Sequence, residues 1–192
     1  MQTVRQQRLE RVASQRQAGF IVVLEDIHDP HNAAAILRTC DAFGVQDVWF
    51  IFNQEKAYNP RRVGKSSSSS ANKWLTFRVF KSVTECKAAL KRLQYESVGT
   101  VLHDKAEDFT KAKLTAKRIA LWVGNEHAGL SEQAVEACDR LLLLPMRGFV
   151  ESLNVSVMTA ISIYEITRQR AGKKYQRSQR ESATLLKDFL KR

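Results

Sequence analysis

Three stretches of the sequence place polar side chains and glycines between a strand and a helix. In the last of them, over residues 143–165, an apolar strand ends at Pro145 and a short loop leads to a long apolar helix that begins near Asn154. Parallel α/β proteins bind ligands at the carboxyl ends of their strands, so residues of these types at such a junction indicate a ligand site. An ordinary strand–loop–helix connection is the alternative for this segment taken alone.

Two further junctions of the same kind lie upstream. One carries Gly124 and Glu126 after an apolar strand, and the other carries Asn32 and Arg38 at the start of a helix. Asn32 and Arg38 are about 600° of helical rotation apart, which leaves them roughly 120° apart around the helix. Their side chains can therefore converge only because arginine is long and Asn32 lies in the first turn.

In this order and spacing, the three stretches resemble the motifs of the SpoU family of RNA ribose 2′-O-methyltransferases. The family pattern is Asn followed six residues later by Arg, then G-x-E-x-x-G, then P-M-x-G-x-x-x-S-L-N-V-S. The matching residues are Asn32, Arg38, Gly124, Glu126, Gly129, Pro145, Met146, Gly148, Ser152, Leu153, Asn154, Val155 and Ser156. The likeness extends over about residues 20–170, and the third motif makes it specific.

The resemblance implies an enzyme that uses S-adenosylmethionine to methylate a ribose 2′-OH of RNA. It also implies that the backbone at Thr100, Gly124, Leu144, Met146 and Leu153 lines the adenosine pocket, although each residue could instead belong to the core. A Rossmann-type methyltransferase would carry a Gly-rich loop after its first strand. Residues 25–29 follow the first expected strand here and contain no glycine, which argues against that type.

The same resemblance gives the catalytic set Arg38, Asn32, Glu126, Ser152 and Asn154. In the family proposal, Arg38 is the base that activates the 2′-OH. Because guanidinium stays protonated, Arg38 could equally clamp the adjacent phosphate and stabilise a developing oxyanion. Asn32 would then orient Arg38 or the ribose, Glu126 would order the site, and Ser152 and Asn154 would hold the loop or the substrate. Ordinary surface or helix-end roles are the alternative for each residue.

The net charge of +11 on 192 residues points to a polyanionic partner, with a basic surface kept for solubility as the alternative. Basic residues crowd both ends of the chain, and more lie in a long loop at residues 53–73 that includes five serines. We expect RNA to order this loop, with a flexible linker as the alternative for its serine run. The residues predicted to bind RNA are Arg8, Arg11, Arg61, Arg62, Lys65, Arg168, Lys173 and Lys174.

Short basic extensions, residues 1–18 and 171–192, flank a domain at residues 19–170. This layout resembles the family members that methylate guanosine 18 in the D-loop of tRNA, whereas ribosomal-RNA enzymes commonly carry an added domain. Ribosomal RNA, another tRNA position, or a non-catalytic RNA-binding module are the alternatives. The resemblance further implies a homodimer.

Apolar runs at residues 20–24, 48–52, 74–80, 97–102, 119–123 and 141–144 predict strands that alternate with helices. They predict an α/β fold with a mainly parallel sheet flanked by helices. The N-terminal residues predict a short surface helix without a core of its own. The resemblance implies more: a SPOUT-type fold whose C-terminal part threads back into a trefoil knot.

The chain shows no signal peptide and no apolar run long enough to span a membrane, so we expect a soluble, cytoplasmic protein. Its three cysteines have no C-x-x-C spacing and are expected to be reduced. His28 and His31 could share a metal, but Pro30 separates them and no further ligand cluster accompanies them. A structural or RNA-facing role is therefore expected for both, and no metal site is predicted.

Overall fold

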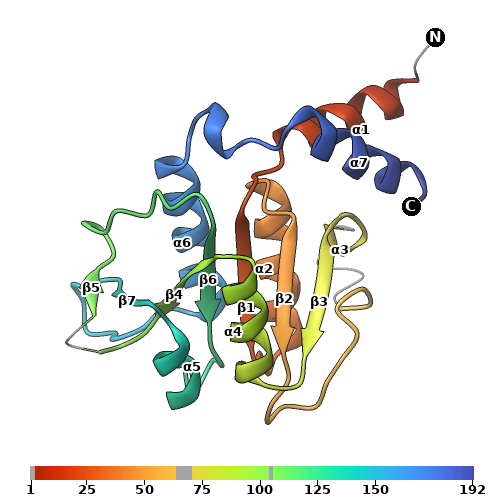
Figure 1. The fold of residues 1–192 in the computed structure, drawn as a ribbon. Coiled ribbons are helices and arrows are strands. Elements are labelled where there is room, and N and C mark those ends of the chain that lie inside the picture. Colours follow the sequence, from red (N-terminus) through yellow and green to blue (C-terminus); the bar gives the residue numbers. More distant parts are fainter. Residues whose placement is uncertain (1–2, 64–70, 104–105) are drawn as a thin grey trace.

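A computed structural model describes residues 3–63, 71–103 and 106–192 (Figure 1). The helices are α1 (Val4–Gln15), α2 (Pro30–Ala42), α3 (Ala71–Trp74), α4 (Val83–Arg92), α5 (Glu132–Ala137), α6 (Val155–Gln169), a 3-10 helix (Lys173–Tyr175) and α7 (Gln179–Leu190). The strands are β1 (Phe20–Glu25), β2 (Asp47–Ile51), β3 (Thr76–Phe80), β4 (Glu96–Thr100), β5 (Glu107–Asp108), β6 (Ile119–Val123) and β7 (Arg140–Leu143).

The strands form one sheet in the order β3-β2-β1-β6-β4-β7-β5, and every neighbouring pair is parallel. Every residue of β1 and of β6 is buried. A parallel strand covered on both faces is a continuous apolar run, which is why these two strands are recognisable in the sequence. The predicted α/β fold with a mainly parallel sheet is confirmed, and the knot stays a prediction.

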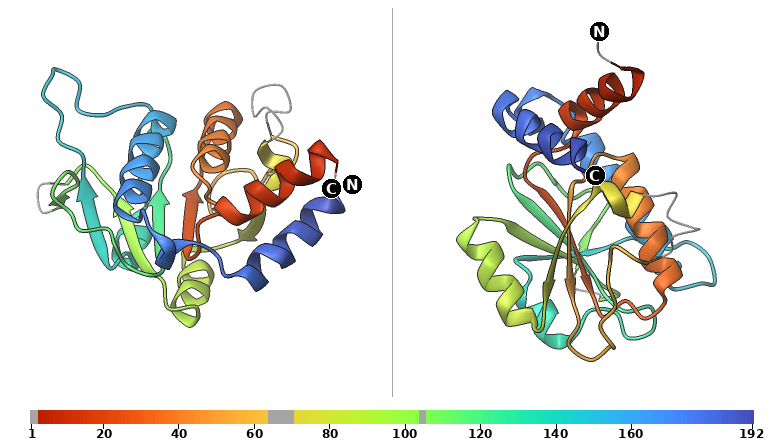
Figure 2. Two further views of the ribbon diagram at one scale, coloured as in Figure 1. Left: turned by 90° about the horizontal axis from the view of Figure 1, so that it is seen from above. Right: turned by 90° about the vertical axis from the view of Figure 1, so that its right-hand side faces the viewer.

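Helices cover both faces of the sheet (Figure 2). On one face α2 packs beside α6, and Ile36 and Ile163 join the side chains of β1 in the larger core. On the other face α4 and α5 cover Trp122, with Leu90 and Ala134 in contact with the same apolar cluster. The carboxyl ends of the parallel strands therefore meet at one edge, where the loops after β1, β4, β6 and β7 come together.

The prediction that the N-terminal helix lacks a core of its own is wrong. Leu9 and Ala13 of α1 pack against Leu185 and Phe189 of α7, and Trp74 packs against the same cluster. The two terminal helices thus lie together at one end of the molecule (Figure 1). These apolar residues are few among the charged ones, so the basic composition conceals the buried face.

The expected strand at residues 74–80 begins too early, because Trp74 ends α3 and β3 starts at Thr76. The two-residue strand β5 was not predicted, since it is too short to produce a pattern. Lys65 and the serine run at residues 66–70 lie outside the described residues. Within the described ranges, no helix is both long and apolar enough to cross a membrane.

Candidate active site

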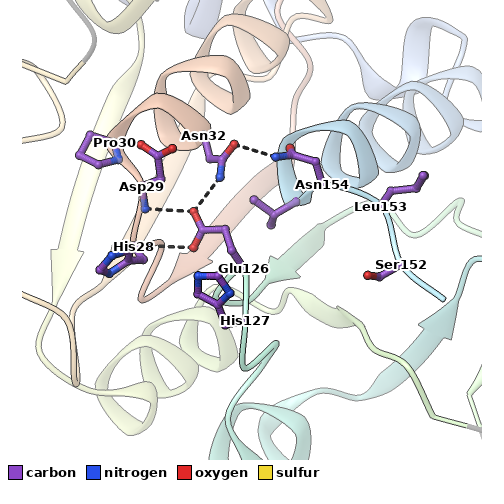
Figure 3. A pocket seen from close by; sticks show the side chains of 10 residues that line it. His28, Asp29, Pro30, Asn32, Glu126, His127, Ser152, Leu153 and Asn154 are labelled. Carbon is purple, nitrogen blue, oxygen red and sulfur yellow. Dashed lines mark hydrogen bonds between the residues drawn. The ribbon is translucent and has the colours of Figure 1, made fainter. Parts of the chain in front are cut away.

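The carboxylate of Glu126 lies against the N-terminal end of α2 (Figure 3). It accepts hydrogen bonds from the backbone N–H groups of His28, at 2.9 Å, and Asp29, at 3.1 Å, and from the side-chain amide of Asn32, at 2.9 Å. Burial disfavours the charged carboxylate, but these hydrogen bonds outweigh it and hold the pKa of Glu126 below its ordinary value of 4.5. Glu126 is therefore ionised at neutral pH.

Asn32 connects Glu126 to the third motif. Its amide nitrogen donates to Glu126, and its carbonyl oxygen accepts a hydrogen bond from the Asn154 side chain at 3.1 Å. The carbonyl oxygen of Asn154 in turn accepts from the backbone N–H and the hydroxyl of Ser156, which caps the start of α6. One chain of hydrogen bonds thus joins the three sequence motifs.

Two glycines shape the turn that presents Glu126. Asn125 and Gly129 exchange a pair of backbone hydrogen bonds of 2.9 Å, and Gly129 has a φ of +69°. A Cβ atom on Gly124 would lie 2.1 Å from the carbonyl carbon of Gly129, closer than any side chain allows. The side chain of Asn125 also donates to the backbone oxygen of Asp26, so this turn is tied to the end of β1.

Two adjoining pockets open around this network. The first, here named the α2 pocket, has a volume of about 630 Å³. It is lined by His28, Asp29, Pro30, Asn32, Glu126, His127, Ser152, Leu153, Asn154 and Val155. The second, here named the strand-end pocket, has a volume of about 370 Å³ and extends over the ends of β4, β6 and β7. Both pockets share Glu126, His127, Ser152, Leu153 and Val155.

All five residues predicted to bind the cofactor line the strand-end pocket: Thr100, Gly124, Leu144, Met146 and Leu153. Apolar side chains at Val135 and Met158 complete its wall. A pocket of this size, made of strand-end backbone and apolar side chains, suits an adenosine group, which such sites bind mainly through packing and a few backbone contacts. The residues present therefore fit S-adenosylmethionine.

Four of the five predicted catalytic residues meet at the α2 pocket, namely Asn32, Glu126, Ser152 and Asn154. Arg38 does not join them. It is exposed on α2 and lines neither pocket, and no described residue forms a hydrogen bond or ion pair with its guanidinium. Within this chain the arginine is thus separate from the amide and carboxylate groups that precede it in the motif.

The cations predicted to bind RNA lie in several places. Those in the described residues are all exposed: Arg8, Arg11, Arg61, Arg62, Arg168, Lys173 and Lys174. Arg168 forms an ion pair with Glu165 at 2.7 Å, Arg61 lies over the ring of Phe77, and Lys65 is outside the described residues.

Two other arginines of the basic ends are structural. Arg16 is buried and bonds to Asp41, and Arg170 is buried and donates to the backbone oxygens of Ala18 and Ala116. Desolvation by burial lowers the pKa of Arg170. The terminal positive charge is therefore only partly available to a ligand.

Two histidines that line the α2 pocket were not among the predicted site residues: His28, which was expected to have a structural or RNA-facing role, and His127. Glu55, whose carboxylate lies 3.0 Å from Nδ1 of His28, was not among them either. The position of both histidines was a usable signal, because His28 lies three residues after the buried strand β1 and His127 four residues after β6. Nothing in the pattern around Glu55 indicated its partner.

Comparisons with known proteins agree with this geometry. Residues 19–164, which include every residue that lines the two pockets, match the model of the SpoU rRNA Methylase family. A tRNA (guanosine(18)-2'-O)-methyltransferase of Thermus thermophilus is 38% identical over 169 residues, which cover 86% of this chain and 83% of that protein.

Solved structures give the same picture. The A. aeolicus TrmH/SpoU tRNA modifying enzyme has a TM-score of 0.84 at 30% identity, covering 96% of this chain and 94% of that one. The SpoU methyltransferase AviRb of Streptomyces viridochromogenes, in complex with the cofactor AdoMet, has a TM-score of 0.71 at 27% identity and covers 82% and 60% of the two chains.

Proposed function

This chain belongs to the SpoU methylase family, and from that premise we propose that it methylates a ribose 2′-OH of RNA, at guanosine 18 in the D-loop of tRNA. The observation that carries the proposal is the junction of the two pockets. The strand-end pocket fits S-adenosylmethionine, and the α2 pocket beside it has room for a nucleotide. Their shared wall includes Glu126, which is held in place by the three hydrogen bonds that its carboxylate accepts from the start of α2.

In this mechanism the protein mainly positions the reactants. Backbone and apolar groups of the strand-end pocket hold S-adenosylmethionine, which supplies an electrophilic methyl group when bound. Glu126 fixes the start of α2 and orients Asn32, and Asn154 fixes the other side of Asn32. Ser152 lies on the shared wall, where its hydroxyl can reach a ribose in the α2 pocket.

Arg38 acts in this proposal as a phosphate clamp. Its guanidinium is exposed and unpaired among the described residues, so it is free to bind the phosphate beside the target ribose through two parallel hydrogen bonds. A fixed positive charge there also stabilises negative charge that develops on the acceptor oxygen.

We further propose that two copies of the chain form a homodimer through α6. Val157, Ile161 and Tyr164 lie on one face of this helix and are 48%, 37% and 53% exposed, and the ring of Phe43 on α2 contacts Tyr164. An apolar stripe of this kind favours burial against a second copy. Because α2 lies beside α6, the dimer would bring Arg38 near the partner's pockets, which accounts for its distance from those of its own chain.

The identity of the RNA is supported by the exposed cations near both termini and by the named activity of the T. thermophilus relative. We also propose that the protein acts in the cytoplasm, where it would meet an RNA of this kind. The family model's description names rRNA, so ribosomal RNA is the second substrate to compare.

The test is incubation of the full chain with S-adenosylmethionine and an unmodified tRNA transcript, followed by nuclease digestion and mass spectrometry. We expect 2′-O-methylguanosine at position 18, and none in a transcript with 2′-deoxyguanosine there. Methylation of a ribosomal RNA fragment alone would replace tRNA as the substrate. S-adenosylmethionine binding without methylation of any RNA would refute the proposed activity.

A further inference from the structure

Methylation of a hydroxyl releases a proton, and Arg38 cannot accept it because a guanidinium is already protonated. The proton acceptor must therefore be another group within reach of the α2 pocket. Among the residues that line this pocket, the titratable side chains are those of His28, Asp29, Glu126 and His127.

The two carboxylates are poor candidates. Asp29 caps α2, and its oxygen accepts the backbone N–H of His31 at 2.7 Å. Glu126 accepts three hydrogen bonds, which lower its pKa and make it a weaker base than a free carboxylate. Both groups are committed to holding the start of α2.

His28 is held as a general base would be. Its Nδ1 lies 3.0 Å from Oε1 of Glu55, and an ionised carboxylate can only accept a hydrogen bond. Nδ1 therefore carries the proton of the neutral ring, and Nε2 is left with a free lone pair. By contrast, the ring of His127 has no hydrogen-bond partner among the described residues to fix its tautomer.

The surrounding structure holds this pair in place. The backbone N–H of Glu55 donates to the carboxylate of Asp26 at 3.1 Å, and the backbone N–H of His28 donates to Glu126 at 2.9 Å. The His28 side chain is 61% exposed, so a proton taken up there can pass to water.

We propose that His28, oriented by Glu55, is the proton acceptor of the methyl transfer, an inference that rests on the proposed function. Nε2 of His28 takes the 2′-OH proton as that oxygen bonds to the methyl carbon of the sulfonium donor. The C–S bond breaks, its electron pair stays on sulfur, and the proton then leaves Nε2 for water. In this arrangement Arg38 is the phosphate clamp and His28 is the base.

Several titratable groups lie around His28. Glu55, Asp29 and Glu126 are the carboxylates nearby, and the ring of His127 lies 6.4 Å away between centroids. Tyr58 stays neutral because burial, and then the charges of these carboxylates, raise its pKa. A proton already on Nε2 would occupy the lone pair that has to accept the 2′-OH proton, so activity should fall as the solution becomes acidic.

The first experiment measures single-turnover methyl transfer to the tRNA transcript against pH. His28→Gln should slow transfer roughly 100-fold or more, without a matching loss of tRNA affinity. It should also flatten the acid limb of the pH–rate profile, which is the range where the rate falls as the pH is lowered. Glu55→Gln should slow transfer less, because the ring keeps its place but loses the carboxylate that fixes its tautomer. His31→Gln is the matched control and should keep the acid limb, since its side chain lines neither pocket.

The second experiment needs neither cofactor nor RNA. In the protein labelled with 15N-histidine, NMR should show His28 with an unprotonated Nε2 and a protonated Nδ1. Glu55→Gln should remove that preference, and Glu136→Gln, which removes an exposed carboxylate on α5, should not.

Three results would overturn the proposal: an Nε2–H tautomer in the wild type, full rate in His28→Gln, or loss of the acid limb in His127→Gln alone. Each of these leaves the wild-type methylation intact. Absence of methylation by the wild type would instead refute the proposed function itself, and the two failures are therefore distinguishable.

Discussion

Asn154 and Asn32 are 122 residues apart in the sequence, and the amide nitrogen of Asn154 donates to the carbonyl oxygen of Asn32 at 3.1 Å. Glu126 can only accept from Asn32, so it determines which end of that amide faces Asn154. Because Asn154 also caps α6, one side chain ties the start of α6 to the start of α2. The two functions of Asn154 can be separated by substitution.

Asn154→Asp should remove methylation activity while leaving the fold nearly as stable as the wild type. Aspartate still accepts hydrogen bonds at the start of α6 but has no N–H for Asn32. Asn154→Ala should lose the same activity and, in addition, about 1 kcal/mol of unfolding free energy through loss of the cap. Methylation assays and urea unfolding measure the two effects. Wild-type activity in Asn154→Asp would contradict the positioning role of the contact with Asn32.

Gly124→Ala should impair cofactor binding more than any other single methyl addition at the strand ends. The added Cβ would overlap the backbone of Gly129 and Leu130, so the turn that presents Glu126 must move. Forced repacking of this kind costs about 1–3 kcal/mol of stability. Isothermal titration with S-adenosylmethionine and thermal unfolding measure both consequences. Gly148→Ala is the control, because a Cβ there meets no atom within 4 Å.

Arg170 and Arg168 are two residues apart, but their substitution should have opposite consequences. Arg170→Met leaves the part-buried carbonyl oxygens of Ala18 and Ala116 without their donor and should cost roughly 3 kcal/mol of unfolding free energy. Arg168→Met removes only an exposed ion pair with Glu165 and should leave the stability almost unchanged. Chemical unfolding of both variants tests this; equal losses would contradict the structural assignment of Arg170.

These two arginines also show where sequence reasoning stops. The motif residues and the buried strands could be predicted because residue type and spacing are local properties. Burial of Arg170 depends on carbonyl groups brought in from distant segments, and charge counting treats every arginine as exposed. The expectation that the basic ends offer their charges to a polyanionic partner is therefore wrong for the buried Arg16, and it stays a prediction for exposed residues such as Arg8.

The contacts within the site depend on the order of the strands. Glu126 reaches Asn32 because β6 lies directly beside β1, although β2, β3, β4 and β5 come between them in the sequence. Apolar periodicity predicts each strand but not its neighbours. In the same way, Glu55 reaches His28 from the loop after β2, which the carboxylate of Asp26 holds through three backbone N–H groups. Such pairings are visible only in the folded chain.

Glu126→Gln should reveal a pH-dependent contribution to stability. The pKa of Glu126 is lower in the folded state than its ordinary value of 4.5, so its hydrogen bonds add stability that is fully present above pH 4.5. This stability is lost as the pH falls through the lowered folded pKa. The difference in unfolding free energy between wild type and Glu126→Gln should therefore be constant near neutral pH and narrow below pH 4.5. A difference that does not change between pH 7 and pH 3 would show that the carboxylate is not held in this way.

The last prediction concerns Arg38, whose distance from its own pockets suggests that the working site takes this residue from a second copy. Arg38→Ala and Gly124→Ala should each be nearly inactive. The first lacks the guanidinium that clamps the phosphate, and the second binds the cofactor poorly. After the two proteins exchange subunits, each mixed dimer has one site with both features intact, so about a quarter of all sites should regain activity. Methyl transfer to the tRNA transcript before and after mixing measures this recovery. If mixing restores nothing, although native mass spectrometry shows mixed dimers, Arg38 acts on the pockets of its own chain.

In either case, a phosphate clamp predicts that Arg38→Lys is impaired, because lysine keeps the charge but loses the paired hydrogen bonds.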